Sequence, residues 1–401
     1  MQCRWWAGAQ GAGVAVVLGV SILMAACGGG NSAGTAGLPA ATALSAQAAL
    51  GDKIFADMSL SASGRQSCAS CHSTENAHGP ANDLPVQPGG LLMDLQGRRN
   101  SPSINYLSFN PAFYFAADGT PTGGFFLDGR ATSLKDQAGQ PFLGAIEMAN
   151  ADKAEVVARL ARAAYADEFK RVFGADILLR PDDAFDRISL ALQQYQREDT
   201  GFRAFSSLYD AFLRGTATLS AAQTRGLALF NSPAKGNCAA CHPSARSADG
   251  SLPLFTDFSY DNLGVPRNPA IARNADPAYF DLGLCEQPGL ARRTDLCGAF
   301  KVPSLRNVAL RRAFFHNGRF GTLKDALTFY VQRDTQPEKW YGRAADGSVD
   351  KFDDLPPAYR GNVNTTEAPY NRRAGDPPAL SDAEIDDVIA FLKTLSDGYR
   401  P

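Results

Sequence analysis

Apolar residues recur at helical spacing in several segments of this 401-residue chain. The clearest segment lies near the C-terminus, where the capping box Ser381-Asp382-Ala383-Glu384 precedes apolar residues spaced three and four apart, from Ile385 to Leu392. A second helix is expected to begin after Ser220, and residues 152–173 and 184–195 show the same periodicity. No segment shows the sustained alternation of a strand. The pattern therefore predicts an all-α protein.

The first residues follow a different pattern, because an apolar run of small residues follows Arg4 and continues to about residue 26. Such a run is typical of a secretory signal peptide, predicted here as residues 1–26. It ends in Leu23-Met24-Ala25-Ala26-Cys27, which resembles a bacterial lipobox, so Cys27 is the candidate for lipidation; an ordinary signal peptide cut nearby is the alternative. Residues 27–44 begin with a glycine-rich stretch that suits a flexible tether. No other apolar run could span a bilayer, so we expect a periplasmic protein held to a membrane only by a lipid anchor.

Three short patterns occur twice in the chain, in the same order. This repetition and the chain length predict two related modules, at residues 45–200 and 201–401. The formal net charge of −2 offers no basic field for nucleic acid. The repeated pairs are Leu50–Phe55 with Arg225–Phe230, Ser101–Asn105 with Val302–Asn307, and Asp128–Asp136 with Asn317–Asp325.

Each module contains one Cys-x-x-Cys-His motif. Two cysteines three apart suit thioether attachment to both vinyl groups of a haem, and the histidine that follows can ligate the iron. A zinc site would need further ligands near each cysteine pair, and the chain has only 4 histidines. The sequence therefore predicts two covalently bound c-type haems, attached through Cys68, Cys71 and His72 and through Cys238, Cys241 and His242.

The remaining cysteines and methionines restrict the chemistry further. Cys285 and Cys297 are the cysteines left over in the second module, and in an oxidising compartment we expect them to form a disulfide. Met148 is the last methionine of the chain. The second haem therefore cannot take a methionine from its own module, and its sixth ligand must be His316, a tyrosine, a lysine, water or a group from the first module.

The order and spacing of these elements resemble the bacterial di-haem cytochrome c peroxidase/MauG family, from about residue 46 to 397. The resemblance implies that the first haem reacts with hydrogen peroxide and that the second relays electrons. It rests on the two haem motifs together with Arg99–Ser103, Asp128–Ala131, Gln137, Pro141, Glu147-Met148, Pro303–Asn307 and Phe315–Gly318.

The resemblance also assigns roles to individual residues. Gln137 and Glu147 match the polar pair above the peroxide-binding haem, where a carboxyl group can move a proton and an amide can orient the peroxide. Ordinary polar residues beside a helix end are the alternative. Tyr330, fourteen residues after His316, matches the distal ligand of the second haem, which is methionine in the peroxidases of the family and tyrosine in MauG-like members. The alternatives are that Tyr330 is a core aromatic residue or that His316 is the ligand.

Other positions concern the surroundings of the haems. Family members usually have tryptophan where this chain has Leu127, so the path between the haems would run through Phe125, Phe126 or Trp340, or by direct tunnelling. His78 is expected to be a solvent-facing loop residue that leaves the first haem with an open position; the alternative is that His78 is a removable ligand of that haem, for which it is the only histidine available. The resemblance further implies a calcium ion between the modules, with Asn100 as its side-chain ligand and Arg311 and Ala313 as backbone ligands.

The sequence thus favours an oxidoreductase that reduces peroxide at the first haem. Its electrons would come from a small periplasmic redox protein, such as a cytochrome c or a cupredoxin, or from side chains of a specific partner protein, as in MauG-like enzymes. A di-haem electron carrier or redox sensor without catalytic activity is the remaining alternative.

Overall fold

The computed structural model describes residues 43–400, which from Leu44 onward form one compact unit. The expected signal peptide and Cys27 lie outside the described residues, as does nearly all of the expected tether. No helix within this described part combines the length and the apolar character that a bilayer span requires.

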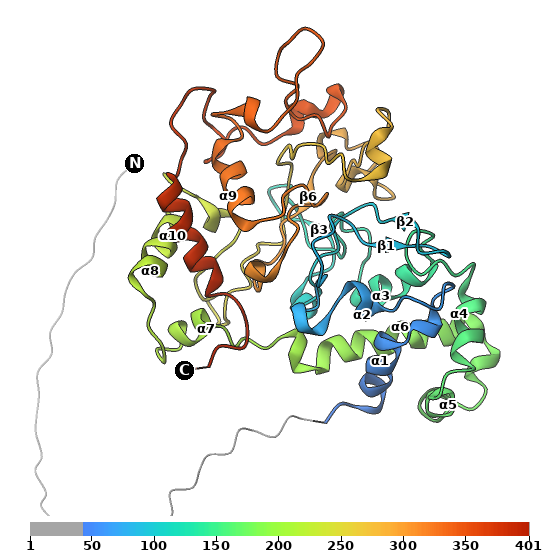
Figure 1. Ribbon diagram of the computed structural model, residues 1–401. Helices are drawn as coiled ribbons and strands as arrows, with labels where there is room; N and C mark the ends of the chain where they lie inside the picture. Colours follow the sequence, from blue (N-terminus) through green and yellow to red (C-terminus); the bar gives the residue numbers. More distant parts are fainter. Residues whose placement is uncertain (1–42, 401) are drawn as a thin grey trace, which may run out of the picture. The chain divides into compact units, whose positions relative to one another are not determined.

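The described chain is rich in helices and contains only very short strands (Figure 1). The strands form three two-stranded antiparallel pairs, β1 with β2, β3 with β4 and β5 with β6. The helices are α1 (Ala46–Ala56), α2 (Cys68–Cys71), α3 (Leu134–Leu143), α4 (Lys153–Leu160), α5 (Ala166–Phe173), α6 (Pro181–Glu198), α7 (Leu208–Leu213), α8 (Ala221–Asn231), α9 (Leu323–Gln332) and α10 (Asp382–Lys393). The strands are β1 (Pro88–Gly89), β2 (Leu95–Gln96), β3 (Tyr114–Phe115), β4 (Pro121–Thr122), β5 (Tyr260–Asp261) and β6 (Phe300–Lys301).

The expected helices are largely present. Ser381 and Ser220 each cap a helix with a reciprocal capping box, at α10 and α8. The periodic segment 152–173 is interrupted by a turn between α4 and α5, while 184–195 lies inside α6. The strands were not expected, because a pair of two-residue strands leaves no alternation to detect in a sequence. The fold is therefore helix-rich with a few strands, not purely helical.

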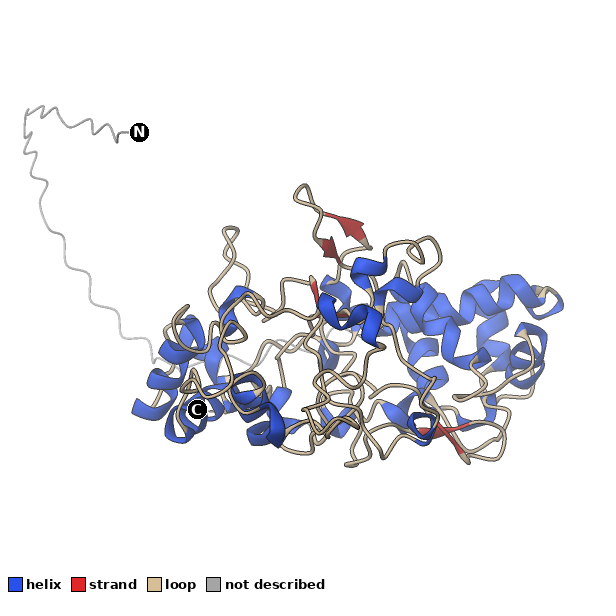
Figure 2. Cartoon of the chain, turned by 90° about the horizontal axis from the view of Figure 1, so that it is seen from above, coloured by secondary structure: helices blue, strands red, loops and turns tan. Residues whose placement is uncertain are grey.

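Two separate hydrophobic cores hold these helices. One contains buried side chains between Leu50 and Phe202 and the other those between Tyr209 and Leu395. In each core two helices touch at a glycine: a Cβ on Gly51 of α1 would lie 2.1 Å from the carbonyl oxygen of Ala191 in α6, and one on Gly226 of α8 would lie 1.9 Å from that of Asp387 in α10. Figure 2 shows the helices gathered on two sides of the described chain, with long loops between them.

Candidate active site

The first haem motif lies at the short helix α2, and its histidine is oriented by the loop that follows. The backbone N–H of His72 donates to the carbonyl oxygen of Cys68 at 2.9 Å, while its ring Nδ1 lies 3.1 Å from the carbonyl oxygen of His78. Burial lowers the pKa of His72 to about 4, so the ring is neutral. A neutral imidazole that donates from Nδ1 leaves the Nε2 lone pair free for a metal.

The second motif repeats this geometry. The N–H of His242 donates to the carbonyl oxygen of Cys238 at 2.8 Å, and its Nδ1 lies 2.8 Å from the carbonyl oxygen of Phe255. Burial again lowers the pKa of the histidine. All four motif cysteines are free thiols. Both sites therefore fit a covalently attached haem, with two thiols for its vinyl groups and one free imidazole nitrogen for its iron.

A cavity of about 310 Å³ adjoins the second motif. Its walls include side chains from both halves of the chain, and they are largely apolar, as the faces of a haem require. From the second half they include Cys238, Cys241, His242 and Tyr330, and from the first half Asn100, Phe126, Leu127 and Gln137.

Tyr330 lies on α9 beside the second motif. Burial is the main cause that raises the pKa of its phenol; the carboxylate of Asp261 raises that pKa further, and Arg333 partly offsets the shift. The ring packs 5.3 Å from Phe315 between centroids. The position agrees with the expected ligand role, although a core aromatic residue that lines the cavity would lie in the same place.

His316, the alternative ligand, has other partners. Its ring stacks on Phe300 with a centroid distance of 3.8 Å. Its Nε2 lies 3.5 Å from Oδ2 of Asp354. His316 lines the same cavity as Tyr330, but a ligand role would require its imidazole to leave this aromatic stack and this carboxylate.

Glu147 lies near the first motif, in the loop after α3. Its backbone is fixed because its N–H donates to the carbonyl oxygen of Gly144 at 2.9 Å and its own carbonyl oxygen accepts from Gly90 at 2.8 Å. Burial raises the pKa of the Glu147 carboxyl, and Arg130 partly offsets this effect. The carboxyl also contributes to the raised pKa of Cys71, after the larger effect of burial. A carboxyl with a raised pKa beside the first motif can both donate and accept a proton.

Gln137 lies on α3, where its backbone N–H donates to the carbonyl oxygen of Ser133 at 2.9 Å. Its side chain lines the cavity next to the second motif, whereas Glu147 does not. The fold thus places the expected polar pair on one helix and the loop that follows it, but the two side chains do not line the same cavity.

The expectation that His78 faces solvent is wrong. The residue is only 4% exposed, and its ring stacks on Phe202 at 3.7 Å between centroids. Its Nδ1 lies 2.7 Å from Oδ1 of Asn105. The cause is a turn with positive φ at Ala77 and His78, which directs the ring into the first core, and nothing in the sequence signals that turn.

The side-chain arrangement of the residues expected to bind calcium does not suit that ion. The Oδ1 of Asn100 accepts a hydrogen bond at 2.9 Å from Nη2 of Arg311. The Nδ2 of Asn100 donates to the carbonyl oxygen of Ala313 at 2.9 Å. No group of three or more His, Cys, Asp or Glu side chains that could hold a metal occurs among residues 43–400. The guanidinium of Arg311 is therefore hydrogen-bonded to the side-chain oxygen that would have to coordinate the calcium ion.

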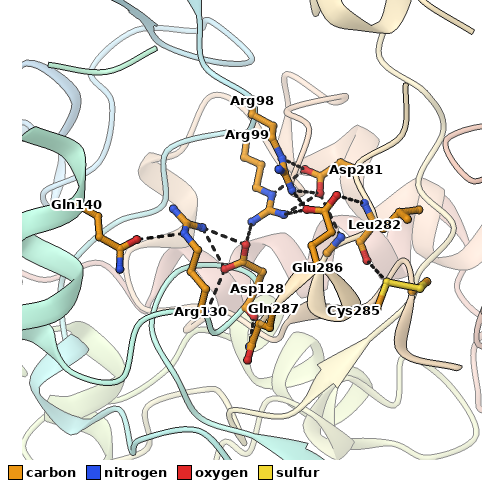
Figure 3. Close-up of polar contacts among 12 residues, drawn as sticks. Arg98, Arg99, Asp128, Arg130, Gln140, Asp281, Leu282, Cys285, Glu286 and Gln287 are labelled. Atoms are coloured by element: carbon orange, nitrogen blue, oxygen red, sulfur yellow. Dashed lines mark hydrogen bonds and ion pairs between the residues drawn. A yellow bond between two sulfur atoms is a disulfide. The ribbon is translucent and has the colours of Figure 1, made fainter. Parts of the chain in front are cut away.

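A network of ion pairs joins the two halves near the disulfide between Cys285 and Cys297 (Figure 3). Arg99 contacts Asp281 at 2.7 Å, and it also pairs with Asp128, which Arg130 contacts at 3.0 Å. Burial alone would raise the pKa of Asp281, but the charge of Arg99 lowers it far below its usual range. These partners are separated by up to 182 residues, so the sequence pattern gave no sign of them.

Phe126 and Leu127 both line the cavity that adjoins the second motif. Trp340 is partly buried and packs against the second core, with its ring centroid 5.6 Å from that of Phe329. Of the residues expected to bridge the haems, Phe126 lines the cavity, whereas Phe125 and Trp340 do not.

Known proteins resemble the chain along most of its length. Residues 45–218 match the family model described as di-haem cytochrome c peroxidase. The methylamine utilization protein MauG of Paracoccus denitrificans is 36% identical over 371 residues, which cover 89% of this chain and 90% of that protein. The cytochrome c551 peroxidase of Nitrosomonas europaea is 32% identical over 284 residues, covering 70% of this chain and 71% of that protein.

A solved structure shows the same architecture. The diheme peroxidase BthA from Burkholderia thailandensis superimposes with a TM-score of 0.81 at 40% identity, covering 88% of this chain and 86% of that one. The matches to MauG and BthA cover 89% and 88% of the chain and therefore extend over both halves, each of which contains one haem motif. The chain belongs to the di-haem cytochrome c peroxidase/MauG family, and it is a peroxidase-type enzyme with two c-type haems.

Proposed function

We propose that this protein is a periplasmic enzyme that reduces hydrogen peroxide at the haem of residues 45–200, with electrons delivered through the haem of residues 201–401. The observation that carries the proposal is the difference between the two motifs. The first has a buried carboxyl group, Glu147, nearby, whereas the second has the phenol of Tyr330.

A haem held by Cys68, Cys71 and His72 would supply the electrons that reduce peroxide. The protein must move one proton between the two peroxide oxygens, and Glu147 has the properties for this task. Burial raises the pKa of this carboxyl, which makes it a better proton donor than an exposed glutamate while it can still accept the proton back. The family resemblance also gives the amide of Gln137 the task of orienting the peroxide; because Gln137 lines the cavity beside the second motif, this role rests on the resemblance alone.

Tyr330 supports a different role for the second haem. A phenolate ligand stabilises oxidised iron more than a methionine does, so this haem would keep a closed coordination sphere and relay electrons. Phe126 and Leu127 belong to the first half of the chain and line the cavity beside the second motif, and we propose that electrons pass through this segment.

A second candidate function is the oxidation of side chains in a partner protein. Two observations favour it, namely the position of Tyr330 beside the second motif and the similarity to MauG over 90% of that protein. The two functions differ in the electron donor, which is a small redox protein such as a cytochrome c or a cupredoxin in one case and a protein substrate in the other. The non-enzymatic alternative, an electron carrier or sensor, is set aside because the chain belongs to a family of enzymes.

The experiment that tests this proposal adds stoichiometric peroxide to the purified, oxidised protein and follows its absorption spectrum. A peroxidase reacts after partial reduction and then turns over with a reduced redox protein. A MauG-like enzyme instead forms a long-lived oxidised state without prior reduction. Absence of any reaction in both conditions would refute peroxide chemistry.

The residue-level proposal needs its own variant. Glu147→Gln should slow the reaction with peroxide strongly while both haems remain attached, because the amide cannot exchange a proton. The matched control is Glu338→Gln, an exposed glutamate in the second half of the chain. If the two variants react at the same rate, Glu147 has no role in the reaction.

A further inference from the structure

Arg311 lies between the two halves of the chain and is held by oxygen atoms. Its Nη2 donates to Oδ1 of Asn100 and to the carbonyl oxygen of Ser101, both at 2.9 Å. Its Nε donates to the carbonyl oxygen of Ala313 at 3.3 Å. These acceptors are an amide and two backbone carbonyls, which are uncharged.

The guanidinium therefore has no anionic partner within residues 43–400. Burial lowers the pKa of Arg311 to about 10, and no carboxylate counteracts this effect. Its Nη1 is buried and makes no hydrogen bond. A buried cation without a partner is strongly unfavourable, so the arrangement requires an anion that the polypeptide does not supply.

The location of Arg311 restricts what this anion can be. Its positive charge contributes to the lowered pKa of His72, after burial, so it lies near the first motif. The residue also lines the cavity that adjoins the second motif. Each bound haem carries two carboxylate side chains, and these are the anions that two attached haems bring into this region.

The same contacts explain why calcium does not fit here. The family resemblance assigns two oxygens to the ion, Oδ1 of Asn100 and the carbonyl oxygen of Ala313. The first already accepts a hydrogen bond from Arg311, and the second accepts one from Asn100. A guanidinium at this place also repels a divalent cation.

We infer that Arg311 is a permanent positive charge that replaces the calcium ion between the modules and pairs through Nη1 with a carboxylate of a bound haem. This inference depends on the two attached haems but not on the reaction that they catalyse.

Two measurements on the purified protein with both haems attached test the inference. In the first, calcium chloride is titrated into chelator-treated protein in a calorimeter while the haem spectra are recorded. We expect no calcium binding and no spectral change after the chelator is added. Stoichiometric binding, or a spectral change that calcium reverses, would overturn the replacement of calcium.

The second measurement is the midpoint potential of each haem by spectroelectrochemistry. Removal of a nearby positive charge favours oxidised iron, so Arg311→Gln should shift at least one potential to a lower value. Arg311→Lys keeps the charge and should retain a potential near that of the natural protein. The matched control is Arg312→Gln, which removes an exposed arginine one position away.

The outcomes of the second measurement are also decisive. Equal potentials in Arg311→Gln and Arg312→Gln would overturn the pairing with a haem carboxylate. If Arg311→Gln fails to retain its haems, the test uses Arg311→Lys instead. This variant keeps the positive charge, so midpoint potentials that differ clearly from those of the natural protein would contradict a charge-based role. Neither readout requires turnover with peroxide.

Discussion

Gly144 controls the position of the Glu147 carboxyl group. A Cβ atom on Gly144 would lie 2.2 Å from Oε2 of Glu147 and 3.1 Å from its Cδ, whereas ordinary contact begins at 3.4 Å. The Gly144→Ala substitution therefore has to displace Oε2 by about 1 Å. A misplacement of that size can lower the rate of a reaction that depends on the displaced group by roughly 100-fold.

The cost to folding should be small. Gly144 has a φ of −64°, which alanine adopts without strain, and the atom that must move is the end of a flexible side chain. Replacing glycine by alanine at such a position changes the free energy of unfolding by at most about 1 kcal/mol, in the stabilising direction. We therefore expect a protein that is folded and carries both haems but reacts with peroxide about 100-fold more slowly, equivalent to about 2.7 kcal/mol of barrier.

The assay is stopped-flow absorbance of the reaction with peroxide, with urea unfolding as the measure of stability. The control is Gly361→Ala, because no atom lies within 4 Å of the Cβ that it adds. In a Glu147→Ala background, Gly144→Ala should have almost no further effect on the rate, because no carboxyl remains to be displaced. A wild-type rate in Gly144→Ala, or a full effect without Glu147, would refute this reasoning.

Three further predictions concern the second half of the chain. Tyr330→Phe should change the absorption spectrum of one haem only; no change would reject the ligand role. Burial lowers the pKa of Lys301 from 10.5 to about 7, so the unfolded chain binds an extra proton there between these values and the stability of the natural protein should rise with pH in that range. Lys301→Met should remove this rise, measured by urea unfolding at about pH 7 and about pH 9. Replacing Cys285 and Cys297 by serine should lower the free energy of unfolding by about 3 kcal/mol, since the bond closes a short loop; an unchanged urea midpoint would contradict this.

Local features of the fold could be predicted from the sequence. The capping boxes at Ser220 and Ser381 depend on residues three positions apart, and both begin helices as expected. The haem motifs depend on five consecutive residues, and both have the geometry that attachment needs. The position of Tyr330 relative to His316 in the sequence singled it out as a candidate ligand, and the structure shows that it lines the cavity beside the second motif, while the ligand role stays a prediction.

Contacts between distant residues could not be predicted in this way. The stacking of His78 on Phe202 and the bond between Arg311 and Asn100 each depend on how loops far apart in the chain meet. Charge counts and periodicity contain no information on such pairs. The side chain of Arg311 therefore changes the expectation for calcium only once its neighbours are known.

The internal duplication stays a prediction, although matched hydrogen bonds support it. The Oγ of Ser103 donates to the carbonyl oxygen of Ala77 at 2.6 Å, and that of Ser304 donates to the carbonyl oxygen of Leu254 at 2.6 Å. Both acceptors lie in the loop that follows a haem motif. The equivalent contacts are what two copies of one module would keep.

The contacts of Lys301 with the first half of the chain have a consequence for unfolding. Its Nζ donates to the carbonyl oxygen of Gly124 at 2.7 Å, and its backbone N–H donates to that of Leu127 at 2.8 Å. Separation of the halves would break these hydrogen bonds, and it would also expose the ion pair of Arg99 and Asp281 to water. Heating should therefore melt both halves in a single calorimetric transition, and a polypeptide cut near residue 200 should yield fragments that do not fold alone.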